Sequence, residues 1–397
     1  MNPRRHVSDD ERRARIAVRH ALAPEYRVDS PEAATRAMTV LHATESATVY
    51  LSCWARVRSV DIADIDRTLY DERTVAKQLA MRRTLFAFPR DLLPSAWSSA
   101  SARVANTERA RMSKDVVNAG LAIDGNDWLD RARAEVLALL ADVPEGLSAL
   151  DVRRAVPMID VKVSGTSGEI WSTPRVLTYL GATADIVRGT NVGRFPTTRA
   201  RWTLTQHWLD GASPLGSAVD GYREIIRRWL HTFGPGTEDD IVWWLGSTKT
   251  VVRTALAELD AVSVSLDDGA TGWVLPDDLD EVVDPGPWVA LLPALDPTIM
   301  GWKARDFYLG PHRNQLFDNR GNAGTTVWVN GRAVGCWIQD ADGVVQVRLL
   351  ETVSSQAKRA LETEAARLSE WLGGVKIGTG YNSPSMKSEL VSPSRQP

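Results

Sequence analysis

The feature that most constrains the fold is an order of elements that recurs three times along the 397 residues: helices followed by a strand hairpin. Apolar residues at helical spacing mark the helices, and β-rich segments with glycine turns mark the hairpins. This order is typical of a winged-helix unit. The repeat lies in the order of elements and has no strict sequence period, so it does not predict a solenoid. We therefore predict three tandem winged-helix units, at residues 1–100, 101–213 and 214–283.

The first predicted unit is mainly helical. Residues 30–32 supply an N-cap serine, a first-position proline and an early carboxylate, and they predict a helix that runs to about residue 41. Apolar residues at helical spacing predict another helix from about Ser46 to Val57. Residues 84–88 read as a strand that a proline stops.

The second and third predicted units follow the same order. In the second unit, helices are predicted at residues 128–140, 148–156 and 173–181, and a hairpin follows at 188–201. In the third unit, helices are predicted at 219–232, after the capping Thr237 and from about 248 to 259, with short strands at 262–266 and 273–275.

The composition changes at Asp284 and becomes β-rich. Strands are predicted at residues 288–295, 325–329, 333–338 and 344–350, separated by turn residues. We expect a small antiparallel barrel or sheet at 284–353, then a C-terminal part at 354–397 with a helix to about 372. Residues 378–397 are expected to form a loose tail. The predicted fold class is therefore α+β.

Composition excludes several classes of protein. The charged N-terminus is not a secretory signal, and no apolar run is long enough to span a membrane. Cys53 and Cys336 form no CxxC pair, which favours a reduced, cytoplasmic setting. The six histidines are dispersed, so neither a metal site nor a cofactor is predicted.

The net charge of −3 counts mildly against a nucleic-acid partner. Residues 188–201, however, read RGTNVGRFPTTRAR, with four arginines and no acidic residue. A local basic stripe of this kind can bind phosphates on a protein that is acidic elsewhere. A solvated hairpin explains the same residues equally well.

The usual catalytic motifs, GxxxxGK[ST], HExxH and GxSxG, are absent from the sequence. One segment remains, where one predicted helix ends and the next begins: His42, Thr44 and Glu45. An extended backbone at such a junction would bring an imidazole, a hydroxyl and a carboxylate close together. The alternative is structural, with His42 near the negative end of a helix dipole and Thr44 capping the next helix.

The chain resembles the AlkZ-like winged-helix DNA glycosylases over roughly residues 10 to 353. The strings LHATESATVYLSCWARV and QLAMRRTLFAFPRDL resemble the N-terminal signature of that family. GPGTEDDIVWWLGSTKTVVRTALAEL resembles its later helix-turn-helix unit, and LLPALDPTIMGWKAR with VWVNGRAVGCWI resembles its C-terminal β region. The resemblance implies a C-shaped array of three winged helices that encloses double-stranded DNA, and excision of alkylated bases, including interstrand crosslinks in some members.

The resemblance also implies a catalytic position. His42 and Thr44 stand where the family commonly has Gln-x-Gln or Gln-x-Asp. A purine alkylated at N7 or N3 already carries positive charge and leaves without an acid, so the site need only place a water and stabilise the transition state. We expect His42 to accept the proton of the water, Thr44 to orient the water, and Glu45 to hold the imidazole tautomer or stabilise cationic charge, although a first-turn helix carboxylate is the alternative for Glu45.

Further residues are expected to contact DNA. Arg82 and Arg83 precede the first wing strand, and Thr173 and Arg175 open a possible recognition helix. The other expected contacts lie in the arginine hairpin, with Phe195 as the candidate wedge at its tip: Arg188, Arg194, Phe195, Arg199 and Arg201. We predict a monomer on damaged duplex, since three winged helices in one chain can encircle DNA. A non-catalytic or regulatory DNA-binding protein is the alternative.

Overall fold

A computed structural model describes residues 4–165, 168–193, 195–197, 199–210 and 216–387. The chain divides into two compact units. Compact unit 1 comprises Met1–Ile65, Arg227–Trp244 and Ala257–Pro397, and compact unit 2 comprises Asp66–Ile226 and Leu245–Leu256. The fold is α+β, and its sheets are small. The predicted five-part division follows the order of elements and not these two units, so its boundaries stay a prediction.

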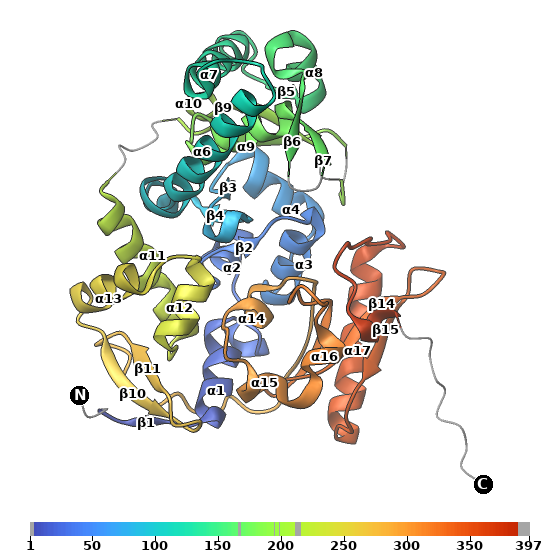
Figure 1. The fold of residues 1–397 in the computed structure, drawn as a ribbon. Coiled ribbons are helices and arrows are strands. Elements are labelled where there is room, and N and C mark those ends of the chain that lie inside the picture. Colours follow the sequence, from blue (N-terminus) through green and yellow to red (C-terminus); the bar gives the residue numbers. More distant parts are fainter. Residues whose placement is uncertain (1–3, 166–167, 194, 198, 211–215, 388–397) are drawn as a thin grey trace. The chain divides into compact units, whose positions relative to one another are not determined.

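The second predicted winged helix forms most of compact unit 2. Its helices are α6 (Ala102–Asn118), α7 (Gly125–Ala141), α8 (Ala149–Ala155) and α9 (Ser172–Ala182). Its strands β5 (Leu147–Ser148), β9 (Ala200–Leu204) and β8 (Ile186–Asn191) form an antiparallel sheet in that order. Figure 1 labels β5 and β9 among the helices of this unit. Ser148 caps α8, as the helix predicted from residue 148 requires. A hairpin of β6 (Lys162–Gly165) and β7 (Gly168–Trp171), which was not predicted, separates α8 from α9.

A second hairpin of compact unit 2 lies before this winged helix. Strand β3 (Val75–Leu79) pairs antiparallel with β4 (Leu85–Pro89), which confirms the strand predicted at residues 84–88. Strand β3 was not predicted. Both arginines of the connecting turn, Arg82 and Arg83, have positive φ angles of 52° and 59°. The short helices of this unit are α5 (Leu93–Ala96) and α10 (Thr205–Trp208), and α4 (Ile62–Asp66) lies at the chain boundary between the two units.

The third predicted winged helix follows the expected order. Its helices are α11 (Ala218–Phe233), α12 (Glu238–Leu245) and α13 (Lys249–Glu258). Strands β10 (Val262–Leu266) and β11 (Thr271–Val274) form its hairpin, and the N-terminal strand β1 (His6–Val7) adds to β10 in parallel. Thr237 and Asp240 exchange the two hydrogen bonds of a capping box, which confirms the predicted start of α12.

The N-terminal helices belong to compact unit 1. They are α1 (Asp9–Arg19), α2 (Pro31–Ala37) and α3 (Ser46–Arg56), and the two-residue strand β2 (Leu41–His42) lies between α2 and α3. The side chains of Ser8 and Ser30 accept hydrogen bonds from the first turns of α1 and α2.

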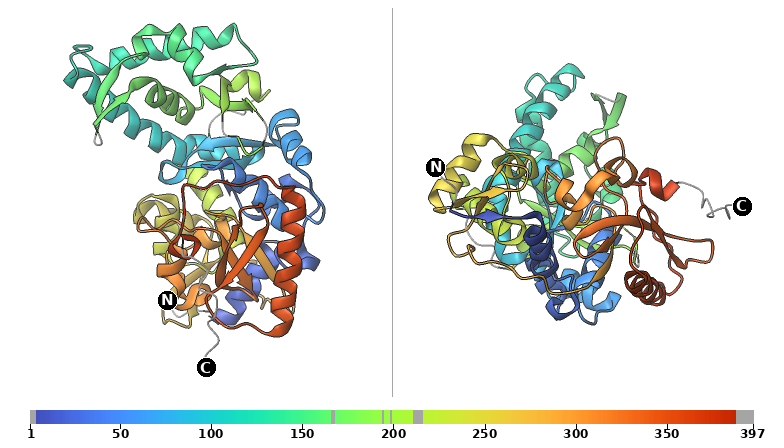
Figure 2. Two further views of the ribbon diagram at one scale, coloured as in Figure 1. Left: turned by 90° about the vertical axis from the view of Figure 1, so that its right-hand side faces the viewer. Right: turned by 90° about the horizontal axis from the view of Figure 1, so that it is seen from below.

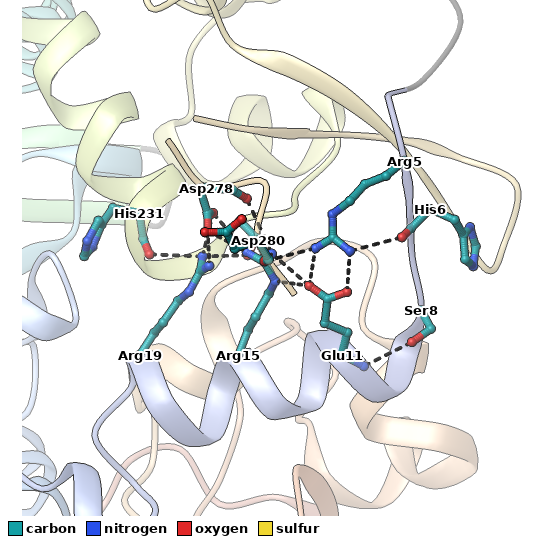
Figure 3. Close-up of polar contacts among 10 residues, drawn as sticks. Arg5, His6, Ser8, Glu11, Arg15, Arg19, His231, Asp278 and Asp280 are labelled. Carbon is teal, nitrogen blue, oxygen red and sulfur yellow. Dashed lines mark hydrogen bonds and ion pairs between the residues drawn. The ribbon is translucent and has the colours of Figure 1, made fainter. Parts of the chain in front are cut away.

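An ion-pair network holds α1 to the segment that follows the third winged helix (Figure 3). Arg15 binds Asp278 at 2.9 Å and Glu11 at 2.9 Å. Arg5 also binds Glu11, and Arg19 also binds Asp278. Burial alone would raise the pKa of Glu11, but the hydrogen bonds from Arg5 and Arg15 outweigh it and lower that pKa below 4.5. The network therefore needs Glu11 ionised.

The C-terminal β region is an open sheet, which settles the predicted choice between a barrel and a sheet. Its strands run in the order β12 (Val289–Leu292), β13 (Thr326–Val329), β14 (Arg332–Gln339) and β15 (Val345–Leu349), all antiparallel. Helix α17 (Ser355–Leu372) packs against β12 and β15, beside the sheet in Figure 2. The short helices of this region are α14 (Pro297–Met300), α15 (Asp306–Leu309), α16 (Arg313–Leu316) and α18 (Pro384–Lys387).

The prediction of a loose tail is wrong for residues 378–387. The chain continues past α17, forms α18 and binds the sheet: Arg348 donates to the carbonyls of Ser385 and Met386 at 3.0 and 3.1 Å. Ser383 is fully buried. Residues 388–397 of the predicted tail lie outside the described part of the chain. No helix within the described ranges has the length and apolar character needed to cross a membrane.

Candidate active site

The junction that holds His42, Thr44 and Glu45 is extended. Strand β2 ends at His42, helix α3 begins at Ser46, and Glu45 occupies the N-cap position with φ −101° and ψ 129°. This confirms the predicted break between two helices. It also corrects one alternative, because Thr44 is not the cap of α3. Glu45 takes that position, and its side chain makes no capping hydrogen bond.

The three side chains have different environments. His42 is buried, with 7% of its surface exposed, and its Nδ1 accepts a long hydrogen bond of 3.4 Å from the backbone N–H of Thr44. Thr44 itself is exposed and Glu45 is half-buried. The Glu45 Oε1 accepts a hydrogen bond of 2.6 Å from the backbone N–H of Gly380. A buried imidazole, a solvent-facing hydroxyl and a held carboxylate thus lie within four consecutive residues.

A polar stripe on α3 fixes the helix that carries this junction. The stripe consists of residues four positions apart, and each of them bonds to the segment after β12. Thr48 donates to the Ala294 carbonyl at 2.9 Å, and Ser52 and Arg56 donate to Asp296. The Arg56–Asp296 pair is bidentate, at 2.9 and 2.7 Å, and both side chains are fully buried. The start of α3 is therefore set by contacts along the whole helix.

Burial and the Arg56 charge together determine the protonation of this buried cluster. It would raise the pKa of Asp296, but the charge and hydrogen bonds of Arg56 outweigh it and lower that pKa. Next to the pair, His20 Nδ1 lies 2.9 Å from the Thr298 hydroxyl, and burial lowers the pKa of His20 to about 3. Beneath the junction there is thus an ionised pair beside a neutral imidazole at pH 7.

A cavity of about 390 Å³ opens beside Glu45. Its walls come from the start of α3, from β14 and from the chain after α17, and they include Thr48, Trp337, Lys376, Thr379 and Asn382. These walls mix one aromatic ring with hydroxyl, amide and ammonium groups. The residues of this cavity are far apart in the chain, so no sequence pattern predicts it.

The turn between β3 and β4 gathers arginines. Arg82 and Arg83 line a cavity of about 170 Å³ together with Arg103 and Arg111, which the sequence analysis missed. Glu108, whose side chain is 3% exposed, pairs with Arg83 at 2.8 Å and partly offsets this charge. Arg103 and Arg111 lie eight residues apart on α6, and this helical spacing was the one available signal.

The start of α9 does not fit its predicted role. Thr173 is 1% exposed and donates its hydroxyl proton to the Ile159 carbonyl at 2.7 Å, so it is not available as a contact to DNA. Arg175 is largely buried and pairs with Asp115 at 2.7 Å. Both residues hold α9 in the core of the winged helix.

The arginine hairpin is formed by β8 and β9, as predicted, but its arginines differ. Arg188 lies over the Trp202 ring, 4.9 Å from its centre, and burial lowers the pKa of Arg188. Arg201 donates to the Gly146 carbonyl at 2.9 Å. Arg199 is exposed and makes no side-chain hydrogen bond or ion pair with another described residue. Phe195 is half-buried, and Arg194 lies outside the described residues.

Comparisons with known proteins agree with this architecture. The profile of a family described as DNA glycosylase AlkZ-like matches residues 35–371. The solved structure of Streptomyces sahachiroi DNA glycosylase AlkZ is similar, with a TM-score of 0.75 and 19% identity over 94% of this chain and 98% of that one. A comparison with curated proteins finds no match. The structural similarity shows the shared fold, and the family match covers most of the chain. The chain therefore belongs to the AlkZ-like family and is a DNA glycosylase.

Proposed function

We propose that this glycosylase releases alkylated purines whose charge lies at N7 or N3, from damaged duplex DNA. The observation that supports the proposal most directly is the environment of the junction. A buried His42 lies next to an exposed Thr44 in extended backbone, and the carboxylate of Glu45 follows directly in the chain. Such a site can place a water and stabilise positive charge, but it offers no strong acid to a neutral leaving base.

In the proposed reaction, a water bound by the Thr44 hydroxyl attacks the sugar C1′. The C1′–N9 bond breaks, its electron pair goes to the cationic base, and the base leaves neutral. The proton of the water goes to His42 Nδ1, once this nitrogen has released the long hydrogen bond that it accepts from the Thr44 backbone N–H. The Glu45 carboxylate stabilises the positive charge that develops on the sugar.

The proposed DNA contacts follow from exposure. Arg199 in the β8–β9 hairpin is available to a phosphate, and the Arg82–Arg83 turn with Arg103 and Arg111 presents a second basic cluster. For the other predicted residues of this hairpin, we propose that they stabilise it or add to its contacts with DNA: Arg188, Arg194, Arg201 and Phe195. We further propose that the protein acts as a monomer on the cytoplasmic nucleoid, and that crosslinks formed through N7 are also substrates.

The test is base release from matched duplexes that contain N7-methylguanine, neutral O6-methylguanine or no lesion. We expect free N7-methylguanine and an abasic site from the first duplex only. A duplex crosslinked through N7 tests unhooking, and light scattering with and without DNA tests the monomer. Binding to every duplex without release from any of them would contradict the proposal and leave a non-catalytic DNA-binding protein.

A further inference from the structure

The chain after α17 forms a strap, defined here as residues 376–387, along one wall of the cavity. Its backbone is fixed at both ends by the C-terminal sheet. Ile377 N–H donates to the Gln339 side chain at 2.8 Å, and Arg348 of β15 donates to two carbonyls of α18. The family profile ends at residue 371, so the strap lies beyond the matched region.

The middle of the strap reaches the junction that carries the candidate site. Gly380 donates its backbone N–H to Glu45 Oε1 in a short hydrogen bond of 2.6 Å. On either side of Gly380, Thr379 accepts from the Asn382 side chain at 2.8 Å and from the Tyr381 N–H at 3.0 Å. These local bonds fix the direction of the Gly380 N–H.

Glu45 depends on this contact for its position. It is the N-cap residue of α3, but its carboxylate makes no capping bond to its own helix. The described contacts of the carboxylate therefore come from the strap and not from the helix. Burial and the nearby Glu45 carboxylate also raise the pKa of Tyr381, which fits a phenol held close to that charge.

We infer that the strap is part of the active site, and that Gly380 is a positioning residue that holds the Glu45 carboxylate toward the reacting sugar. This inference rests on the proposed function. The strap also lines the cavity beside Glu45 through Lys376, Thr379 and Asn382. A carboxylate released from the Gly380 N–H would rotate, and its electrostatic effect on the sugar cation would weaken.

Two substitutions at Gly380 distinguish the effect of its N–H group from the effect of the rest of the strap. Gly380→Pro removes the donor. Gly380→Ala keeps it, and an added Cβ would lie 3.7 Å from Glu45 Oε1, an ordinary contact. We expect Gly380→Pro to lower the single-turnover rate of base release by about tenfold to a hundredfold with little change in duplex affinity or melting temperature. Gly380→Ala should stay within about threefold of the wild type.

A double-mutant cycle distinguishes positioning from general damage to the fold. In a Glu45→Ala background, Gly380→Pro should cause no further loss of rate, because the group that it positions is gone. Equal losses in both backgrounds would overturn the inference, and so would a Gly380→Pro variant with the wild-type rate. Full activity of Glu45→Ala would overturn it as well.

Amide hydrogen exchange tests the contact without using activity. The Gly380 amide should exchange slowly in the wild type and at least about tenfold faster in Glu45→Ala, which removes its acceptor. Slow exchange in a wild type that releases no base would reject the proposed function while keeping the contact. Fast exchange in the wild type would overturn the inference whatever the activity.

Discussion

Arg199 differs from the other described arginines of its hairpin because its guanidinium is exposed and makes no bond to the rest of the described chain. Arg188 lies on Trp202, and Arg201 is bound to Gly146. Sequence alone assigned all of them the same role. An arginine whose guanidinium stacks on a ring or donates to a carbonyl is less available to a phosphate. We therefore rank Arg199 first among them as a contact to DNA.

We predict that Arg199→Ala weakens binding to duplex DNA several-fold and lowers the salt dependence of binding by about one phosphate contact. Arg175→Ala serves as the control, because Arg175 is paired with Asp115 in the core and should affect stability more than affinity. Titrations at several salt concentrations measure both quantities. An unchanged salt slope in Arg199→Ala would exclude a phosphate contact at this residue.

At the scale of single residues, the sequence predicted where a residue lies in its element better than what its side chain contacts. Thr173 was placed correctly at the start of a helix. Its hydroxyl, however, donates to the carbonyl of Ile159, in the segment after α8, and does not face the solvent. The junction at His42 was predicted from local signals alone, and the structure confirms its extended backbone. The contact between Glu45 and Gly380 joins residues 335 positions apart, and no local signal indicates it.

Helix α3 is the element on which the candidate site depends. Its polar stripe ends in the fully buried pair of Arg56 and Asp296. The paired charges stabilise each other, but either one alone would be a buried, uncompensated charge. The position of the junction at the start of α3 thus depends on a residue that lies after β12.

We predict that Asp296→Asn lowers the free energy of unfolding by about 3–5 kcal/mol, because Arg56 loses its partner while it stays buried. Asp267→Asn breaks an exposed pair with His6, whose side chains are 52% and 44% exposed, and should cost less than about 1 kcal/mol. Urea denaturation measures both variants. Equal losses would show that the buried pair does not anchor α3.

The buried His20 predicts how stability depends on pH. Its folded pKa of about 3 lies below the ordinary 6.5, so the unfolded chain takes up a proton first as the pH falls. This stabilisation is complete above pH 6.5 and is lost progressively toward pH 3. Between pH 6.5 and 5, we expect a loss of about 2 kcal/mol from this group.

The control for that prediction is His20→Gln, measured by denaturant unfolding at both pH values. The variant should be less stable at pH 7, because it loses ring contacts with Phe233 and Trp302. Its stability should also change less between the two pH values than that of the wild type. A parallel pH dependence in both proteins would mean that His20 is not the group responsible.

At the scale of elements, the predictions succeeded where patterns are local. The hairpin β8–β9 has turn glycines and was predicted, whereas β3 was missed because its polar residues are buried. Gln78 is 3% exposed and bonds to the Gly181 carbonyl at 2.8 Å, and Lys77 bonds to the Tyr70 hydroxyl at 2.9 Å. Partners distant in sequence satisfy these groups, and alternation in the sequence cannot reveal them.

For the whole molecule, the fold was predicted from the order of helices and strands along the chain. The helix-then-hairpin order and the C-terminal sheet are present where the sequence predicted them. The family match covers residues 35–371, and the boundaries of the predicted units stay a prediction. The strap was misjudged as a loose tail because small and polar residues seldom form cores, and its order comes from backbone bonds to distant side chains. A net charge of −3 proved compatible with a DNA-acting protein, since arginines gather locally.

The central claim, that His42 and Thr44 carry the reaction, is tested most directly by single-turnover release of N7-methylguanine from duplex DNA. We predict that His42→Ala and Thr44→Ala each lower the rate at least a hundredfold with duplex affinity retained. Thr363→Ala, at an exposed threonine of α17, should match the wild type. Wild-type rates in both His42→Ala and Thr44→Ala would contradict the claim and place the catalytic groups elsewhere in the chain.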